Sequence, residues 1–202
     1  MPPRVKRSKG PSGTLTEATY RRKAFKHLVA DFENRCAYCM QLLDRPDLEK
    51  EIDHFNAHLK SKPRNQYWNL MLACRTCNNT KRAKLVCDPA DTRRRLLNCT
   101  LENEFPEHIV EADDGRWIAN TPAGDYHLTA LDLNMEFFRR KRAERAALHR
   151  EWDEFRQSAV RYTGNLDAGS AAMLLTTLER FRDEGQRSIP LVTEVGTKQV
   201  CR

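Results

Sequence analysis

Two closely spaced cysteine pairs constrain this chain more than any other feature. Cys36 and Cys39 form one C-x-x-C pair, and Cys74 and Cys77 form a second. Four thiolates at this spacing suit a tetrahedral Zn²⁺ ion, with Zn–S bonds of about 2.3 Å. Because four protein ligands leave no open position on the metal, we predict a structural zinc site that holds other residues in place. Chance pairing of buried cysteines is the alternative, and it does not explain the repeated spacing.

The remaining cysteines do not suggest a disulfide framework. The chain has seven cysteines, an odd number that leaves one unpaired. Cys87, Cys99 and Cys201 have no partner at ligand spacing, so we interpret them as ordinary thiols. The sequence shows neither a secretory signal nor an apolar run of about 18 residues that would predict a membrane span. We therefore expect a soluble protein of the reducing cytoplasm.

Positive charge is concentrated around the second cysteine pair. The chain has 35 Lys and Arg against 28 Asp and Glu, and no acidic residue lies between Phe55 and Cys87. A stretch of one sign suits a polyanionic partner, although a solvated basic surface is the alternative interpretation. The residues that we expect to contact phosphates are Arg75, Lys81, Arg82 and Lys84.

The apolar pattern around the cysteine pairs predicts a helix followed by a ββα unit. Apolar residues recur at helical period from about Thr16 to Phe32. Lys50 to Asn56 and the apolar run from Trp68 to Ala73 are predicted strands. The polar segment from Asn78 to Leu85 is a predicted short helix, which Asp88 and Pro89 end.

The second half of the chain is predicted to be mainly helical. Short strands are expected around Arg116 to Ala119 and His127 to Leu131, followed by helices from about Leu133 to Tyr162 and from about Ala168 to Glu184. The predicted fold class is α+β, with a ββα core, a four-cysteine zinc site, an N-terminal helix and a mainly helical C-terminal extension. The expected divisions are a flexible basic tail at residues 1–14, a zinc-bearing domain at 15–88 and a helical, partner-docking region at 89–202.

Polar residues that suit hydrolysis of a phosphodiester lie between and just after the cysteine pairs. Asp53 and His54 lie near the end of the first predicted strand, Asn69 lies near the start of the second, and Asn78 directly follows Cys77. This order resembles the HNH endonuclease family over about Arg35 to Lys84. The resemblance implies a ββα-metal nuclease, a hydrolase that cuts DNA, with RNA as the alternative substrate.

Each of these residues has an expected role. His54, with an ordinary pKa near 6.5, can accept a proton from water as general base. Asp53 points to the opposite side of a strand from His54, but at a frayed strand end it can reach a metal. Asp53 and Asn78 are the expected oxygen ligands of a catalytic Mg²⁺ or Mn²⁺. By resemblance Asn69 bonds backbone across the loop and orients His54, and a simple Asn turn is the alternative. His58 is a weaker candidate base.

Two other interpretations stay open. A zinc-dependent nucleic-acid or protein adaptor would keep the zinc knuckle without chemistry, and a stand-alone restriction-type nuclease would need no partner. The layout of the chain, with Leu131 to Asn134 and the basic run Arg139 to Arg142, shows a weaker resemblance to the HNH subunits of retron- and Septu-type anti-phage systems. That resemblance implies a defence role beside an ATPase partner.

Overall fold

The computed structural model of the 202-residue chain describes residues 5–44, 49–82, 93–101, 104–163 and 166–188. Within these ranges, short strands are interspersed among helices. In chain order the elements are α1 (Tyr20–Asp31), β1 (Lys50–His54), α2 (Ser61–Arg64), the 3-10 helix η1 (Tyr67–Asn69), β2 (Leu70–Cys74), α3 (Arg75–Lys81), α4 (Glu104–His108), β3 (Ile109–Glu111), β4 (Trp117–Ala119), α5 (Pro122–Ala130), α6 (Glu136–Thr163) and α7 (Ala168–Ser188).

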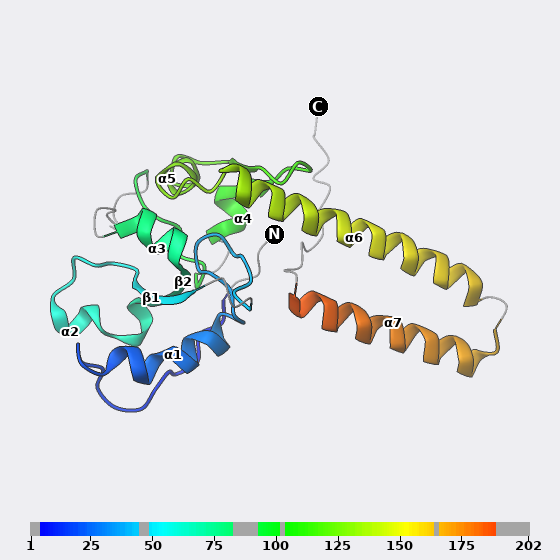
Figure 1. The fold of residues 1–202 in the computed structure, drawn as a ribbon, viewed down its shortest axis with the longest axis horizontal. Helices are drawn as coiled ribbons and strands as arrows, with labels where there is room; N and C mark the ends of the chain where they lie inside the picture. The colour runs from blue at the N-terminus through cyan, green and yellow to red at the C-terminus, as the bar shows by residue number, and fades with distance from the viewer. Residues whose placement is uncertain (1–4, 45–48, 83–92, 102–103, 164–165, 189–202) are drawn as a thin grey trace.

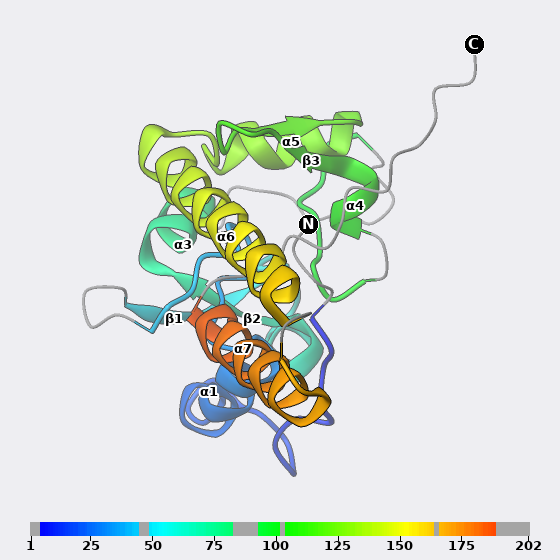
Figure 2. The ribbon, with the colours of Figure 1, turned by 90° about the vertical axis from the view of Figure 1, so that its right-hand side faces the viewer.

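A two-stranded antiparallel hairpin lies at the centre of the first half. β1 pairs with β2 in a register that sets His54 opposite Leu70 and Asp53 opposite Met71. Every residue of β2 is buried, because α1 packs on one side of the hairpin and α3 on the other (Figures 1 and 2). The predicted α+β class and its ββα core are confirmed.

The boundaries of the first helices differ from the predictions. α1 begins at Tyr20 rather than near Thr16, because residues 17–19 form a turn in which the backbone N–H of Tyr20 donates to the Thr16 carbonyl. α3 begins at Arg75 rather than Asn78, directly after Cys74, whose sulfur accepts from the Cys77 N–H and caps the helix. Asn78 therefore lies inside a helix whose start is fixed by a cysteine.

A second small hairpin, β3–β4, packs with α4 and α5. The predicted strand around Arg116 to Ala119 is confirmed as β4, but the predicted strand at His127 to Leu131 is wrong, since this segment is mostly α5. The Thr121 hydroxyl caps α5 by accepting from the Gly124 N–H, and Pro122 stands in its first turn. A Cβ on Gly124 would collide with the His108 carbonyl oxygen, so the missing side chain allows α5 to approach α4 closely.

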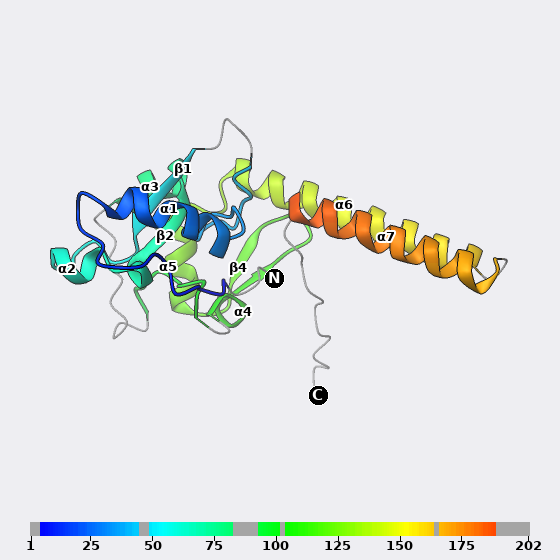
Figure 3. The same ribbon diagram turned by 90° about the horizontal axis from the view of Figure 1, so that it is seen from below.

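The two long C-terminal helices were predicted at nearly their observed positions. α6 and α7 lie side by side and project from the rest of the molecule (Figures 1 and 3). The base of α6 belongs to the core, because Phe138 and Arg142 are buried. Farther along the pair, Leu148, Phe155 and Met173 are exposed. Within the described residues, no helix is long and apolar enough to cross a membrane.

The sequence predicts a flexible tail over residues 1–14; residues 1–4 lie outside the described residues, and the described part is anchored at Val5 and Arg7. Val5 is buried, and its N–H donates to the Cys99 carbonyl over 2.9 Å. The Arg7 guanidinium donates to the Tyr67 and Leu70 carbonyl oxygens over 2.8 and 2.5 Å and lies 5.0 Å from the Phe32 ring centroid. Val5 thus ties this segment to the backbone at Cys99, and Arg7 ties it to η1 and β2.

Candidate active site and zinc cluster

The four predicted zinc ligands converge on one buried point. Cys36 and Cys39 lie in the turn after α1, while Cys74 ends β2 and Cys77 lies in α3. Their sulfur atoms all lie within 4.8 Å of one another, and the Sγ atoms of Cys39 and Cys74 are 3.9 Å apart. Tetrahedral Zn²⁺ with bonds of about 2.3 Å needs sulfurs about 3.8 Å apart, so both the donor set and its spacing fit zinc.

Backbone geometry brings the first cysteine pair to the second. Met40 has a left-handed backbone conformation, with φ of 57°, and its N–H donates to the Cys36 carbonyl, which closes the first pair into a tight turn. The Ala37 N–H donates to the Leu72 carbonyl over 2.7 Å, which ties that turn to β2. The cysteine cluster therefore joins the end of α1, the end of β2 and the start of α3.

His54 lies at the end of β1 on the side that faces α1. Its ring is half-buried, with the centroid 4.9 Å from that of Tyr20 in α1. Its Nε2 atom lies 2.9 Å from Oδ1 of Asn65, which is buried in the loop after α2. Asn65 in turn donates through Nδ2 to a Glu17 carboxylate oxygen over 2.9 Å. His54, Asn65 and Glu17 thus form a hydrogen-bonded row.

This row fixes which nitrogen of the neutral His54 ring carries the hydrogen. Since the Asn65 amide nitrogen donates to Glu17, the amide oxygen faces His54, and Nε2 of His54 must be the donor. The neutral ring then keeps Nδ1 free of a proton, and Nδ1 has no hydrogen bond to any other described residue. Hydrogen bonds from Asn65 and Arg64 hold the pKa of Glu17 below its usual value, so the end of the row is anionic.

The Asn69 side chain is fully buried and is used for backbone contacts across the loop. Its Oδ1 accepts from the Asn56 N–H over 2.8 Å, while Nδ2 donates to the carbonyl oxygens of Asn56 and Arg64 over 3.1 and 2.8 Å. These bonds close the 56–69 loop directly after His54 and position Asn65, the neighbour of Arg64. The backbone contacts agree with those that the resemblance implies for Asn69, and its role in orienting His54 stays a prediction.

Asp53 lies on the opposite side of β1 and is engaged in a buried ion pair. The Lys81 ammonium, only 1% exposed, lies 3.0 Å from one carboxylate oxygen and 3.3 Å from the other. The Tyr38 hydroxyl also donates to this carboxylate, and Lys81 donates to the His54 carbonyl over 2.8 Å. Burial raises the pKa of Asp53, while Lys81 and Tyr38 oppose that shift. Both carboxylate oxygens of Asp53 thus already lie within 3.3 Å of the Lys81 ammonium.

Asn78 faces the same side of the hairpin as Asp53. Its Nδ2 donates to a Glu51 carboxylate oxygen over 2.6 Å, which leaves Oδ1 without a hydrogen bond to other described residues. The Asn78 oxygen is therefore available as a hard ligand, whereas Asp53 would first have to release Lys81. A catalytic metal bound by this pair stays a prediction that the side-chain arrangement fits only in part.

The predicted phosphate contacts fall into different surroundings. Lys81 is buried and paired with Asp53, so in this structure it cannot contact a phosphate. The prediction for Lys81 was wrong because it took every residue of this polar helix to be exposed. Arg75 is exposed but forms ion pairs with Glu49 and Glu51. Arg82 is exposed, and Lys84 lies outside the described residues.

Nothing in the sequence alone selects Asn65, Glu17, Tyr20 or Tyr38 as parts of the site. Asn65 and Glu17 are polar residues in segments full of polar residues, and they lie 48 positions apart. No local pattern marks such a contact, because only the fold brings the start of α1 to the loop after α2.

The fold and the cysteine cluster define a ββα module in which four buried cysteines suited to zinc join the hairpin to α3, with a histidine at the end of the first strand. Residues 36–84 match the family model of the HNH endonuclease, and the match spans both cysteine pairs, Asp53, His54, Asn69 and Asn78. The chain therefore carries an HNH endonuclease domain over these residues. A search of the curated proteins found no match.

Proposed function

We propose that this protein is an endonuclease that hydrolyses phosphodiester bonds in DNA, with His54 as its general base. The observation that carries the proposal is the His54 ring at the end of β1, inside the HNH match, with Nε2 tied to Asn65 and Nδ1 unengaged. A base needs this arrangement, because the nitrogen that takes the proton must be free while the other nitrogen fixes the ring.

Hydrolysis then proceeds through the side chains of this chain. His54 Nδ1 takes a proton from water as the water oxygen attacks phosphorus, and the developing positive charge on the ring is stabilised through Nε2 and Asn65 by the anionic Glu17 carboxylate. The P–O bond to the leaving alkoxide breaks as the new bond forms, and water returns a proton to the alkoxide. A bound Mg²⁺ or Mn²⁺ would neutralise phosphate charge; of its two predicted ligands, Asn78 has an Oδ1 without a hydrogen bond to other described residues, whereas Asp53 is paired with Lys81.

The first test is cleavage of plasmid and single-stranded DNA by the purified, zinc-loaded chain with Mg²⁺ or Mn²⁺. His54→Ala should lower the rate by about 10²- to 10⁴-fold, the usual contribution of general base catalysis. His58→Ala is the matched control, because His58 is an exposed histidine four positions away that could be mistaken for the base. Equal losses in both variants, or undiminished cutting by His54→Ala, would refute the assignment of the base. Cleavage of RNA but not DNA would correct the substrate.

A defence role beside an ATPase partner is the finer proposal, and it rests on the weaker sequence resemblance. The projecting α6–α7 pair supports a docking role in general, because it exposes apolar side chains such as Phe155 and Met173 away from the HNH domain. Purification of the chain from its host together with an ATPase would support this proposal. Full activity of the isolated chain on any DNA would favour the stand-alone, restriction-type alternative.

The non-catalytic adaptor remains the alternative from a different class. It predicts that the folded, zinc-loaded chain binds nucleic acid but never cuts it, with or without a partner. The row from His54 to Glu17 argues against it, since a buried asparagine and a carboxylate that fix one ring nitrogen have no evident use in simple binding.

A further inference from the structure

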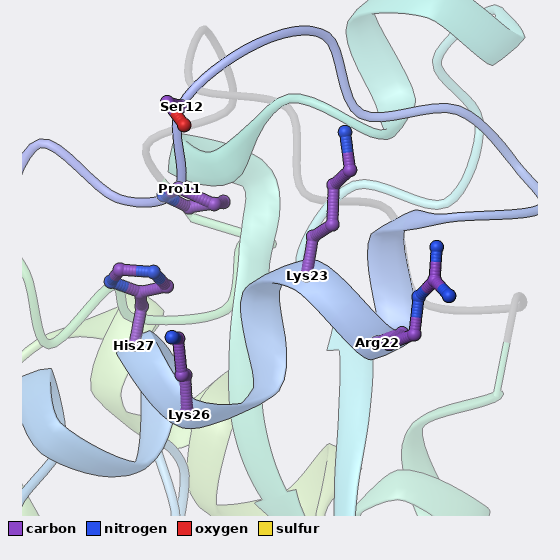
Figure 4. Close-up of a pocket in the computed structure, with 6 residues that line it drawn as sticks. All are labelled: Pro11, Ser12, Arg22, Lys23, Lys26 and His27. Carbon is purple, nitrogen blue, oxygen red and sulfur yellow. The ribbon is translucent and has the colours of Figure 1, made fainter.

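A basic hollow lies between α1 and the segment before it. The hollow has a volume of about 360 Å³ and is lined by Pro11, Ser12, Arg22, Lys23, Lys26 and His27. Figure 4 shows the four basic side chains rising from α1 toward the side on which Pro11 and Ser12 lie. Among the described residues no carboxylate lines the hollow, and the hollow lies outside the acid-free stretch from Phe55 to Cys87.

The cations of this hollow are not neutralised within the described part of the chain. Arg22, Lys23 and Lys26 take part in no ion pair or side-chain hydrogen bond there, unlike Arg64, Arg75 and Lys81. The acids nearest in sequence have other partners, since Glu17 binds Arg64 and Asn65, and Asp31 binds Ser8 and Tyr67. Three unmatched cations around one concave surface attract an anion strongly.

α1 connects this hollow to the proposed base. Tyr20, whose ring contacts His54, is buried at the start of α1, and Lys23 and Lys26 follow three and six positions later. At about 1.5 Å per residue, Lys26 lies about 9 Å along the helix axis from Tyr20. This distance is less than three nucleotide steps along one strand of a duplex, at about 3.4 Å per step. At about 100° per residue, Arg22 and Lys26 lie about 200° and 240° around the helix from Tyr20, so a strand cut at His54 would reach these two cations by passing over the start of α1.

We propose that the hollow is a phosphate-binding site for the substrate strand beside the cut, with Arg22, Lys23 and Lys26 as its cations. The assignment of the strand as substrate rests on the proposed nuclease function. Binding itself does not require chemistry, so the two can be tested separately. Contacts of this kind position a strand without reading its sequence.

The test measures binding to labelled single- and double-stranded DNA by fluorescence anisotropy in the zinc-loaded, full-length His54→Ala chain. On this background, R22Q, K23Q and K26Q are introduced together. The triple variant should bind at least about tenfold more weakly near 0.1 M salt, and the slope of log affinity against log salt should fall by about 2 if two or more duplex phosphate contacts are lost.

The matched control removes the same charge from the outer part of α6, with R150Q, R156Q and R161Q on the same background. These arginines are exposed and lie far from α1 (Figure 1). Unchanged binding in the hollow variant, an equal loss in the control, or no DNA binding by the parent chain would each overturn the site. If the chain binds DNA tightly through the hollow but the wild-type protein never cuts DNA, the phosphate-binding site is supported and the proposed nuclease function is not.

Discussion

At His54, a neighbouring amide decides which ring nitrogen carries the proton. Asn65 presents its oxygen to the ring because its nitrogen is committed to Glu17, and the buried Asn69 holds the loop that carries Asn65. The position of the free nitrogen thus depends on three side chains that never touch the reacting atoms. Asn65 is therefore a positioning residue in the proposed reaction.

Replacement of Asn65 should show whether this residue positions the His54 ring or only stabilises the fold. Asn65→Ala removes the acceptor for Nε2 and should lower kcat by about 10- to 100-fold, the usual effect of losing a partner behind a functional histidine. Glu17→Gln keeps an acceptor for the Asn65 amide but removes the charge at the end of the row, so it should keep more activity than Asn65→Ala. The measurement is kcat and KM of both variants, because loss of ring positioning lowers kcat with little change in KM. A loss that appears only in KM would contradict the positioning role.

The buried Lys81 ammonium should be necessary for stability. Lys81→Met leaves the Asp53 carboxylate buried without its cation, and loss of one partner of a buried pair costs about 3 to 5 kcal/mol. Urea unfolding of the zinc-loaded protein measures this loss. Arg82→Met changes an exposed cation next in sequence and should alter the free energy of unfolding by less than about 0.5 kcal/mol. A small effect of Lys81→Met would contradict a stabilising role for the buried ion pair.

The alternation of side chains along a strand predicted that Asp53 and His54 face opposite sides, and the structure agrees. Lys81 could not be predicted in the same way. It follows the second cysteine pair in a polar, basic segment, and composition alone assigns such a lysine to the surface. Its burial depends on Asp53 and Tyr38, which only the zinc knuckle brings to the same place.

At the scale of elements, the cysteine cluster holds together pieces that are too short to be stable alone. α1, β2 and α3 are short, and helices of this length are marginal in isolation. The cluster fixes the ends of all three, which also fixes the faces that carry His54, Asp53 and Asn78. Metal binding and folding should therefore be coupled in this half of the protein.

Loss of one thiol should release the zinc and disorder the hairpin. Cys74→Ser should lower the zinc content from about one ion per chain to near zero and should abolish cooperative unfolding followed by circular dichroism. Cys99→Ser is the control, because Cys99 is equally buried but lies outside the cluster. Full zinc content in Cys74→Ser, or zinc loss in Cys99→Ser, would show that the ligands are assigned incorrectly.

Most elements of the fold could be predicted from periodicity, but α5 could not. His127 to Leu131 looks like a short strand because apolar and polar residues alternate there. The Thr121 cap and Pro122 instead start a helix, and the contact between Gly124 and His108 holds that helix against α4. Tertiary packing therefore determines the secondary structure of this segment, because its local sequence pattern fits both a strand and a helix.

At the scale of the whole molecule, the apolar core continues across the predicted boundary at residues 88 and 89. One cluster of buried side chains includes Leu28 and Leu72 from the HNH side and Leu97, Trp117 and Phe138 from beyond it. His127 lies at this junction, where its Nδ1 accepts from the Leu97 N–H and its ring packs near those of Tyr38 and Phe105. The two halves should therefore unfold together rather than as separate domains.

His127 should make that shared stability depend on pH. Burial lowers the pKa of His127 from 6.5 to about 4. Between these values the unfolded chain binds a proton that the folded protein excludes, so stability is fully present above pH 6.5 and is lost as the pH falls toward 4. A shift of this size corresponds to about 3 kcal/mol in the free energy of unfolding.

Urea unfolding of wild type and His127→Asn across this pH range measures the effect. Asparagine keeps an acceptor for the Leu97 N–H but does not titrate, so its stability should fall less steeply with acid. Protonation of zinc-bound thiolates also weakens the fold at low pH, but it acts on both proteins, and the difference between their curves isolates His127. Parallel curves would mean that His127 is hydrated or that it keeps its proton in the folded state. A difference detected equally by probes in the HNH half and in α5 would establish that the two halves unfold as one unit.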